Sequence, residues 1–483
     1  MFEANFLVDR NEYQRVIQSA AEIVAQSLPS QPYAGARPGV LAELVPSEFL
    51  PRSAASFDQI AETLRLVVAN SISLVHPRTA AHLHPPPLVA GLAAEVIIGA
   101  LNQSMDSFDQ GPISTVVEQK MVRWLCGEVR FPASASGTFT TGGSQSNYMG
   151  LMLARDAFQK KHWDWSGQKS GLHAEARHLR IFCSEVSHFT VEKSASQLGL
   201  GTDAVVRVAV DDNFRMVPAA LQNAVDKARD ENLFPLAVVA TAGTTDFGSI
   251  DPLMELAMIA HSAGAWLHVD AAYGGALLFS EIHRRRLHGL DAADSVSLDF
   301  HKLFWQPIPC SIFLVRDAGH FDSMKLHADY LNPEGHEEDG IPDLVTTSLL
   351  TTRRFDTLKL WISLLSIGRR QLSAMIDRTL ELANHAAQTI KHTAHLELLA
   401  PVQLSTVVFR YVPGRAGSNG EAINEGLRQR LFERGIAVIG HTRVHDRQCL
   451  KFTCMNPTAS VETMDDLIEQ IAQEGAALES EGL

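Results

Sequence analysis

Polar residues stand at points along the sequence where short apolar runs end. One such run, TTGGSQSN, extends from residue 140 to residue 147 and contains Gly142, Gly143 and Ser144. Two glycines let the backbone approach an anion closely, and a helix that follows them presents free N–H groups to it. The run therefore predicts a phosphate seat. The alternative interpretation is a plain glycine turn in which Ser144 caps a helix.

Two further runs end in a charged residue. AWLHVDAAYGG, residues 265–275, places Asp270 at the end of an apolar strand, where a carboxylate is costly to bury without a cationic partner. Asp270 could pair with the protonated ring nitrogen of a heterocyclic cofactor, cap a helix or bind an arginine. SVSLDFHK, residues 295–302, ends in Lys302, 32 residues after Asp270. Lys302 could form a Schiff base if its pKa is lowered, or it could be a solvated surface lysine.

A histidine completes the set. His188 follows another short apolar run and could stack on a ring or exchange protons, although a lone histidine is more often structural. The combination is more specific than its parts, because pyridoxal 5′-phosphate (PLP) needs its phosphate anchored, its ring nitrogen kept protonated and its aldehyde captured by a lysine. We therefore expect a PLP site.

Short strands that alternate with helices must position these residues. The predicted strands are residues 137–141, 181–184, 205–210, 237–241, 265–270, 295–299 and 311–315. Predicted helices such as 147–160, 218–231 and 252–263 lie between them. This alternation predicts parallel crossovers and a three-layer α/β domain. Open α/β sheets bind ligands beyond the carboxyl ends of their strands, where the polar residues stand.

The pattern changes towards both ends of the chain. Residues 1–70 show helical periodicity around 12–28 and 57–68, separated by a stretch rich in proline and glycine, and predict a helical arm. Residues 71–345 form the predicted large domain and residues 346–483 a smaller one. The predicted elements of the smaller domain are a long helix at 350–392, strands at 404–411, 436–439 and 449–453, and a last helix at 461–478.

Composition excludes several classes of protein. The formal net charge of −14 argues against non-specific binding to nucleic acid or to an anionic membrane. Met1 to Leu7 lack a basic segment before an apolar run, so a secretory signal is not expected. The five cysteines are scattered and form no CxxC pair, which favours reduced thiols. We expect a cytoplasmic protein without a membrane partner.

The sequence resembles a known family. HVDAAYGG followed by DFHK at this spacing is similar to the group II PLP-dependent amino-acid decarboxylases of fold type I, from about residue 70 to the C-terminus. SVSLDFHKLFWQP, HADYLNP and TTRRFDTLKLW most resemble bacterial enzymes that act on L-2,4-diaminobutyrate, with siderophore-pathway lysine decarboxylases close to them. The resemblance implies the aspartate-aminotransferase-like fold, with a mostly parallel seven-stranded sheet in the large domain and a smaller C-terminal α+β domain.

The resemblance also implies roles for the matched residues around PLP. Lys302 would hold PLP as a Schiff base, His301 would help to hold the phosphate, Asp270 would pair with the pyridine nitrogen, Ala272 would pack below the ring and His188 would stack above it. Gly143, Ser144 and Gln145 would bind the phosphate, Thr244 would contact a ring substituent, and Asp251 would support the pocket indirectly. Asp299 stands where some relatives have asparagine, which departs from the family pattern at the phosphate.

Further roles concern catalysis and assembly. Tyr330 matches a tyrosine on a mobile loop that protonates the α-carbon after carbon dioxide leaves. In this fold the loop and part of the phosphate site come from the neighbouring subunit, so the resemblance implies a homodimer with active sites at the subunit interface and makes Thr351, Thr352 and Arg354 candidates for residues that act across it. The resemblance implies that the segment with His82 and His84 lines the substrate side of the pocket, so these histidines would contact the substrate. A metal site is not expected there, because no cysteine or acid cluster accompanies them.

The predicted reaction is the decarboxylation of an amino acid to an amine. L-2,4-diaminobutyrate is the first substrate candidate, lysine or ornithine the second, and an aromatic or acidic amino acid the third. The diamine product would serve siderophore or polyamine synthesis. An aminotransferase or a carbon–carbon lyase on the same fold is the nearest alternative. A serine hydrolase that uses Ser144 with Asp270 and His301 is a different class, but GGSQS lacks the final glycine of a nucleophile elbow.

Overall fold

The computed structural model describes residues 10–482, and the chain divides into two compact units. The larger unit contains residues 87–381 and 400–406, and the smaller one contains the described residues before 87, residues 382–399 and those from 407 onward. The division therefore falls after residue 86 and inside a long helix, rather than at residues 70 and 345. The first seven residues, on which the expectation about a secretory signal depends, lie outside the described part.

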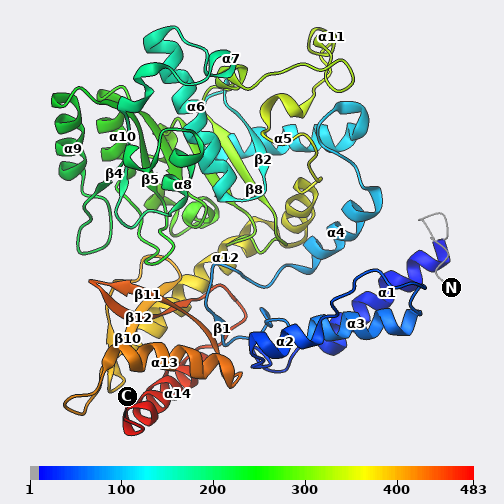
Figure 1. The fold of residues 1–483 in the computed structure, drawn as a ribbon, viewed down its shortest axis with the longest axis vertical. Coiled ribbons are helices and arrows are strands. Elements are labelled where there is room, and N and C mark those ends of the chain that lie inside the picture. The colour runs from blue at the N-terminus through cyan, green and yellow to red at the C-terminus, as the bar shows by residue number, and fades with distance from the viewer. Residues whose placement is uncertain (1–9, 483) are drawn as a thin grey trace. The chain divides into compact units, whose positions relative to one another are not determined.

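The larger unit is built on a seven-stranded sheet in the order β2-β8-β7-β6-β5-β3-β4 (Figure 1). Its strands are β2 (Ser136–Thr140), β3 (Leu179–Ser184), β4 (Val205–Val208), β5 (Phe234–Thr241), β6 (Trp266–Asp270), β7 (Ser295–Asp299) and β8 (Ser311–Val315). The pairs from β7 through β6, β5 and β3 to β4 are parallel, whereas β8 is antiparallel to β7 and β2. The predicted strands and the mostly parallel sheet are confirmed.

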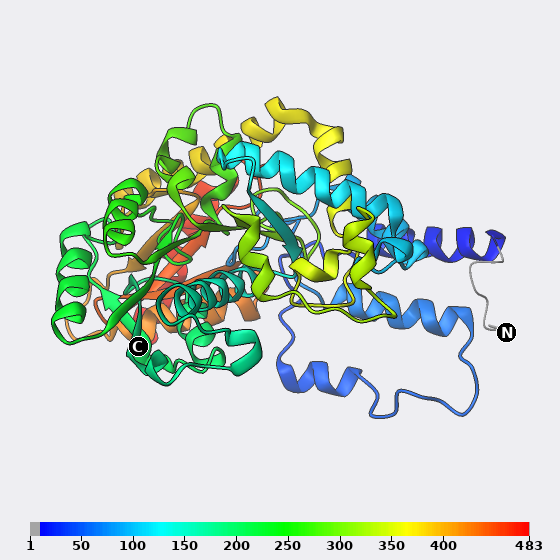
Figure 2. The same cartoon turned by 90° about the horizontal axis from the view of Figure 1, so that it is seen from above.

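Helices cover both faces of this sheet (Figure 2). α6 (Gly143–Trp163) packs against β5 to β8 and contacts α8 (Thr190–Gln197), whereas α9 (Pro218–Asp230) and α10 (Leu253–Ser262) contact each other and β5. α6 connects β2 to β3 and α8 connects β3 to β4, so both connections run towards the β4 edge of the sheet. α9 connects β4 to β5 and α10 connects β5 to β6, so these two run back towards the β2 edge. Because parallel crossovers are right-handed, the two pairs of helices lie on opposite faces.

The central strands of this sheet are covered on both faces. Every residue of β7 and β8 is buried, and so is every residue of β5 after Phe234. Asp270 and Asp299 are the last residues of β6 and β7, and both are buried. The two carboxylates therefore lie at the carboxyl edge of neighbouring parallel strands, where open sheets bind ligands.

Other helices complete the larger unit. They are α4 (Val89–Leu101), α5 (Pro112–Val129), the short α7 (Gly167–Ser170) and α11 (Glu334–Glu338), and the first part of α12 (Thr357–His392). α12 begins seven residues later than predicted and is interrupted at Gly368, whose φ of 66° and ψ of 168° are not helical. Glycine adopts this left-handed φ without the steric cost of a Cβ atom, so the predicted single helix is two helices joined at Gly368.

The smaller unit contains a second sheet of five strands in the order β1-β11-β12-β10-β9. Its strands are β1 (Thr79–Ala80), β9 (Leu396–Leu398), β10 (Thr406–Tyr411), β11 (Val438–Val444) and β12 (Arg447–Thr453), accompanied by α13 (Gly420–Glu433) and α14 (Val461–Ser480). The three predicted strands and the last helix are confirmed. β1 pairs with β11, so residues near 80 belong to this unit rather than to the large domain.

The predicted N-terminal helices are present as α1 (Arg10–Ser27) and α3 (Phe57–Ala69), which contact each other. A third helix, α2 (Pro38–Leu44), lies in the stretch that the sequence analysis placed between them. Figure 2 shows the long loop that joins α2 to α3. The loop carries Phe49 and Leu50, which are 81% and 84% exposed. Within residues 10–482, no helix is both long and apolar enough to cross a membrane.

Candidate active site

A cavity of about 200 Å³ opens at the carboxyl ends of the strands in the larger unit. Its lining brings together residues from segments more than 150 positions apart in the sequence. They are Gly142, Gly143, Ser144, Asn147, His188, Thr241, Gly243, Thr245, Asp270, Ala272, Tyr273, Asp299, His301 and Lys302. Of the predicted site residues, the cavity thus unites Lys302, Asp270, His188, Ala272, His301, Gly143 and Ser144.

The start of α6 forms one end of this cavity. No side chain caps the helix, whose N-cap is Gly142, so its first N–H groups are available to an anion. A Cβ atom on Gly143 would lie 3.2 Å from the Cβ of Ala272 and 3.2 Å from the Oδ2 of Asp299. Glycine is therefore needed for this close approach, and the position fits a phosphate group held by backbone amides.

The side chain of Gln145 is hydrogen-bonded to Thr141. Its Oε1 atom accepts hydrogen bonds of 2.9 Å from the backbone N–H and the hydroxyl of Thr141. Gln145 does not line the cavity that contains Lys302 but does line a neighbouring one with Thr141 and Ser144. Binding of the phosphate by Gln145 stays a prediction, and the hydrogen bonds to Thr141 do not favour it.

Lys302 lies against a carboxylate. Its Nζ atom is 3.2 Å from the Oδ2 of Asp299, and the Nε2 of His301 is 3.6 Å from the same oxygen. The second oxygen of Asp299, Oδ1, is buried and has no hydrogen-bond partner among the described residues. Burial lowers the pKa of His301, and Asp299 opposes that shift. A buried oxygen without a partner leaves room for a ligand that brings a hydrogen-bond donor.

Asp270 lies within hydrogen-bonding distance of several donors. The Nδ2 of Asn147 donates to its Oδ2 at 2.7 Å, and the backbone N–H of Ala272 donates to its Oδ1 at 3.1 Å. Burial by itself would raise the pKa of Asp270, but the charge of Lys302 and the bond from Asn147 hold it below the usual range. Asp270 is therefore an anion, the form that can stabilise a protonated pyridine nitrogen.

His188 is fixed through one ring nitrogen. Its Nδ1 lies 2.8 Å from the Oγ1 of Thr190 and receives a longer contact of 3.4 Å from the Thr190 backbone N–H. Burial lowers the pKa of His188, although the charge of Asp270 opposes the shift. A neutral imidazole held in this way can stack on an aromatic ring without carrying a charge into the cavity.

Two predicted residues support the cavity without lining it. The Oγ1 of Thr244 is 2.7 Å from the Oγ of Ser249, and the neighbouring Gly243 and Thr245 line the cavity instead. Asp251 accepts hydrogen bonds from the backbone N–H groups of Thr241 at 2.8 Å and Met216 at 2.7 Å. Asp251 is therefore bound to the backbone of Thr241, a residue that lines the cavity.

Sequence reasoning missed Asn147 as a functional residue. It was assigned only as the first residue of a helix, yet its side chain lines the cavity and contacts Asp270. Sequence reasoning did not single out His268 either. His268 stands two residues before Asp270 on β6, so the two side chains lie on the same face of the strand. This period of two was the available signal, because a polar residue on the same buried face needs a partner there.

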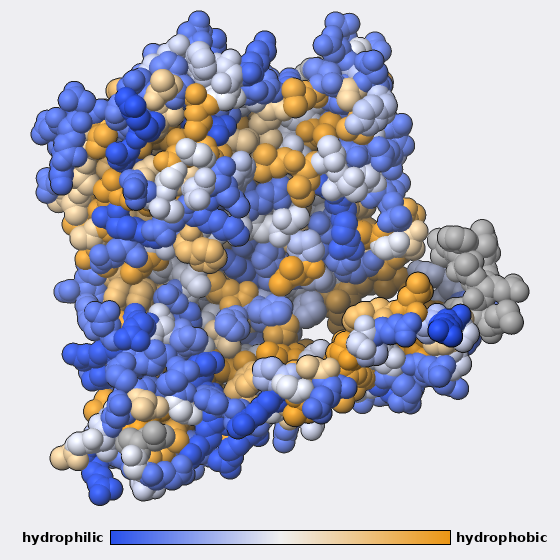
Figure 3. All heavy atoms as spheres, in the orientation of Figure 1, coloured by the Kyte–Doolittle hydropathy of each residue, from blue (hydrophilic) through white to orange (hydrophobic). Residues whose placement is uncertain are grey.

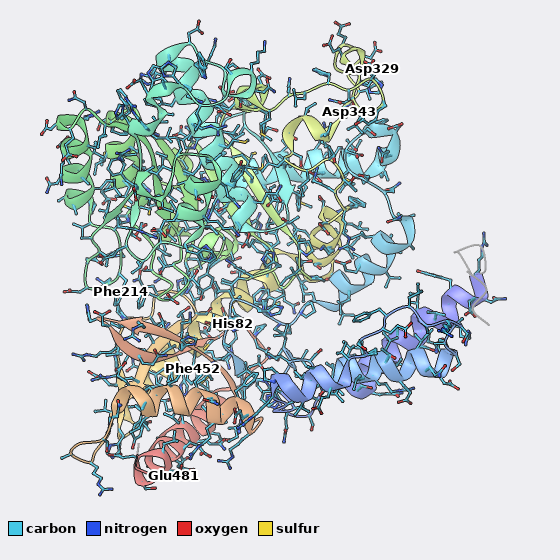
Figure 4. All side chains as sticks on the ribbon, in the orientation of Figure 1. His82, Phe214, Asp329, Asp343, Phe452 and Glu481 are labelled. Carbon is cyan, nitrogen blue, oxygen red and sulfur yellow. The ribbon has the colours of Figure 1, made fainter. Side chains whose placement is uncertain are left out.

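The remaining predicted residues do not line this cavity. Tyr330 is 90% exposed, in the segment that leads to α11 and that carries the labelled Asp329 in Figure 4. His82 and His84 follow β1 in the smaller unit. Arg354 binds Glu95 through its guanidinium group, and Thr351 and Thr352 are exposed.

The chemistry of the cavity fits PLP better than acyl transfer. A lysine, an anionic carboxylate at the end of the neighbouring strand, a stacking imidazole and an uncapped helix start meet the needs of the Schiff base, the ring nitrogen, the ring face and the phosphate. Ser144 has no hydrogen bond to a histidine among residues 10–482, so the nucleophile–base contact of a serine hydrolase is missing there.

Comparison with known proteins agrees with this fit. Residues 38–412 match the pyridoxal-dependent decarboxylase conserved domain. An L-2,4-diaminobutyrate decarboxylase of Acinetobacter baumannii is 41% identical over 419 residues, 85% of this chain and 82% of that protein. One of Rhizobium meliloti (strain 1021) is 42% identical over 421 residues, 87% of this chain and 82% of that protein.

A solved structure extends the likeness over almost the whole chain. It is described as the glutamate decarboxylase domain of diaminobutyrate-pyruvate transaminase and L-2,4-diaminobutyrate decarboxylase from Vibrio parahaemolyticus. It is 40% identical, has a TM-score of 0.89, and covers 98% of this chain and 96% of its own. The fold and the cavity thus define a PLP-dependent enzyme that acts on amino acids. The chain belongs to the pyridoxal-dependent decarboxylase family, and the predicted cofactor and reaction are confirmed.

Proposed function

We propose that this enzyme converts L-2,4-diaminobutyrate to 1,3-diaminopropane and carbon dioxide. The observation that carries the proposal is the identity of 41–42% to two L-2,4-diaminobutyrate decarboxylases over more than four fifths of their length. The reaction replaces the bond between the α-carbon and the carboxylate with a bond to hydrogen, so one proton is consumed for each carbon dioxide released. Lysine or ornithine is the second candidate.

The residues at the phosphate end would anchor the cofactor. Gly143 and Ser144, at the start of α6, line the cavity, and their N–H groups would hold the phosphate, together with His301. Lys302 would hold the cofactor covalently as a Schiff base until the substrate amine replaces it. Ala272 and His188 would fix the plane of the ring. Fixing the ring also fixes which substrate bond stands perpendicular to it and can break.

Asp270 would supply the main electrostatic contribution. Bound PLP provides an electron sink for the breaking bond, and this sink is effective only while its ring nitrogen carries a proton. Asp270 is anionic and accepts hydrogen bonds from Asn147 and Ala272, so it would stabilise that proton. The carboxylate is already oriented before the reaction, so little reorganisation is needed when charge develops on the ring.

Tyr330 would deliver the proton to the α-carbon. Its side chain is 90% exposed within its own chain, which agrees with a residue that acts in the site of a neighbouring subunit. The segment around it contains few buried side chains and one short helix, α11, as expected of a lid that opens and closes. We therefore keep Tyr330 as the proposed proton donor.

Exposed apolar surface supports the proposed homodimer. α1 and α3 leave Val24, Leu64 and Val67 between 42% and 61% exposed, and apolar residues gather along this arm in Figure 3. In the larger unit, α5 and α12 border a mainly apolar cavity of about 350 Å³. Its lining consists of Val117, Lys120, Met121, Trp124, Trp361 and Leu364. Apolar surface of this kind is typical of a protein interface.

Location and pathway are further parts of the proposal. All five cysteines are free and buried, which supports a cytoplasmic location. A diamine is a building block for siderophores or polyamines, and we propose such a use for the product. His82 and His84 stay candidates for substrate contacts.

Substrate preference can be measured directly. The PLP-loaded protein is incubated separately with L-2,4-diaminobutyrate, lysine, ornithine, glutamate and tryptophan, and both carbon dioxide and amine are quantified. We expect the highest kcat/KM with L-2,4-diaminobutyrate. A higher value with lysine or ornithine would move the assignment to that substrate, and a keto acid in place of carbon dioxide would indicate an aminotransferase.

A further inference from the structure

Asn147 lies at the centre of a buried hydrogen-bond network behind the cavity. Its side chain is 1% exposed and makes four hydrogen bonds. The Oδ1 atom accepts from the Nε2 of His268 at 2.9 Å and from the Oγ of Ser297 at 3.0 Å. The Nδ2 group donates to Asp270 at 2.7 Å and to the Oγ1 of Thr190 at 3.1 Å. Every hydrogen-bonding position of the amide is thus used.

Trp266 fixes which group donates and which accepts in each hydrogen bond between Ser295, His268 and Asn147. The Nε1 of Trp266, which can only donate, binds the Oγ of Ser295 at 2.8 Å. The hydroxyl of Ser295 can then donate to the Nδ1 of His268 at 2.8 Å. Burial lowers the pKa of His268 to about 4, so the ring is neutral and its one proton lies on Nε2, facing Asn147.

A glycine makes this contact possible. Gly150 lies three residues after Asn147 on α6, where a Cβ atom would stand 2.5 Å from the Nδ1 of His268. α6 can therefore lie close enough to β6 for the ring of His268 to reach Asn147. The close approach and the four satisfied bonds distinguish Asn147 from an asparagine that merely fills space.

The network reaches two residues of the cavity. Asn147 donates directly to the Oδ2 of Asp270. It also donates to Thr190, whose own hydroxyl proton is then directed to the Nδ1 of His188 at 2.8 Å. Because Nδ1 of His188 accepts, the proton of this neutral ring lies on Nε2. Asn147 therefore links the orientation of Asp270 to the tautomer of His188.

We propose that Asn147 is a positioning residue that keeps Asp270 an oriented anion and His188 in its Nε2-protonated form. The proposal rests on the proposed function where it concerns turnover, and on PLP binding alone where it concerns the spectrum of the bound cofactor. With PLP bound, its protonated ring nitrogen would be the cationic partner of Asp270. The hydrogen bond from Asn147 would keep that carboxylate oriented towards it.

Two substitutions separate this role from simple packing. Asn147→Leu preserves most of the side-chain volume but removes both donors and excludes water, whereas Asn147→Ala leaves space that water can enter. Positioning by hydrogen bonds predicts the larger defect for Asn147→Leu. Packing alone predicts the reverse order, because alanine leaves the larger void. Removing a hydrogen bond to a charged group is expected to lower kcat roughly ten- to a hundredfold, with a smaller change in KM.

The pH dependence of the visible absorption band of lysine-bound PLP gives a readout that does not depend on turnover. A less firmly held Asp270 leaves the ring nitrogen less often protonated, which makes the lysine nitrogen more basic. In both Asn147 variants we expect the pH midpoint of this absorption change to rise by about one unit. Thr190→Val interrupts only the branch to His188, so it should leave the midpoint in place while lowering kcat.

Ser146→Ala is the matched control. Ser146 is the neighbouring residue of α6, is equally buried, and lies 2.7 Å from the hydroxyl of Thr140 rather than near Asp270. This control should keep the wild-type midpoint. If Asn147→Leu fails to fold, Asn147→Ala and Thr190→Val still supply the comparison.

Three results would overturn the proposal. They are an unchanged midpoint in the Asn147 variants, a greater defect in Asn147→Ala than in Asn147→Leu, and an equal midpoint shift in Ser146→Ala. Wild-type protein that binds PLP but releases no carbon dioxide would instead refute the proposed function, and the absorption comparison would still test the role of Asn147.

Discussion

The Nζ atom of Lys302 lies 3.2 Å from the Oδ2 of Asp299, three residues earlier at the end of β7. The cavity therefore has two buried carboxylates, Asp299 near Gly143 and Asp270 at the end of the neighbouring strand β6. Asp270 has hydrogen-bond donors on both oxygens, whereas the Oδ1 of Asp299 has no partner among residues 10–482. The two acids thus differ in how completely their oxygens are hydrogen-bonded within the chain.

Asp299→Asn should strengthen PLP binding. Asp299 lies near Gly143, where we place the phosphate, so its negative charge opposes that of the phosphate. We expect roughly a tenfold lower Kd, which corresponds to about 1.4 kcal/mol. Titration of the apoprotein with PLP by fluorescence quenching measures the change. Asp226→Asn, on the exposed side of α9, serves as the control, and weaker or unchanged binding by Asp299→Asn would contradict the placement of the phosphate.

Gly143→Ala should weaken PLP binding. The new methyl group would lie 3.2 Å from the Cβ of Ala272 and from a carboxylate oxygen of Asp299, and it would enter the space of the phosphate. We expect at least a roughly tenfold higher Kd in the same titration. Gly127→Ala on α5, where a Cβ atom has no neighbour within 4 Å, should bind PLP like the wild type. Equal affinity in both variants would remove Gly143 from the phosphate seat.

Tyr330→Phe should impair protonation of the α-carbon. Phenylalanine keeps the ring but lacks the hydroxyl group, so the negative charge left on the α-carbon would persist and favour a side reaction such as oxidative deamination, in which dissolved oxygen accepts the two electrons. We expect slower amine formation and the appearance of an aldehyde with ammonia, which chromatography of the products detects. An unchanged rate with amine as the sole product would assign the proton to another donor.

Asp251→Asn should alter the pH dependence of stability. Burial raises the pKa of Asp251 from 3.8 to about 6 in the folded protein, so the folded chain binds more protons than the unfolded chain between these values. The stabilising effect is complete below pH 3.8 and is lost as the pH rises to about 6. The loss amounts to at most about 3 kcal/mol.

Asparagine does not titrate, so the difference in thermal midpoint between the wild type and Asp251→Asn should shrink from pH 4.5 to pH 6.5. Differential scanning calorimetry at the two values measures it. A constant difference would show that Asp251 keeps the same charge throughout this range.

The sequence allowed the strands and much of the cavity to be predicted for a clear physical reason. Several strands of the large sheet, such as β5 and β8, are short runs rich in apolar residues, Asp270 ends the strand β6, and Lys302 follows the strand β7. Because parallel strands end at one edge, residues far apart in the sequence could be placed together without knowledge of their contacts.

Other features depended on contacts that no local pattern reveals. His268 and Asn147 are 121 residues apart and meet only because Gly150 lets α6 approach β6. The end of the large unit after residue 381, inside α12, was also missed, because no local feature of the sequence marks it. Residues 79–80 joined the C-terminal sheet through a two-residue strand, which is too short to be predicted.

Borohydride trapping tests the central claim most directly. The wild-type protein is loaded with PLP, reduced, digested and analysed by mass spectrometry, in parallel with Lys302→Ala. We predict that the phosphopyridoxyl group is found on Lys302 and that the variant shows neither this adduct nor turnover. An adduct on a different lysine of the wild-type protein, or full activity of Lys302→Ala, would contradict the account.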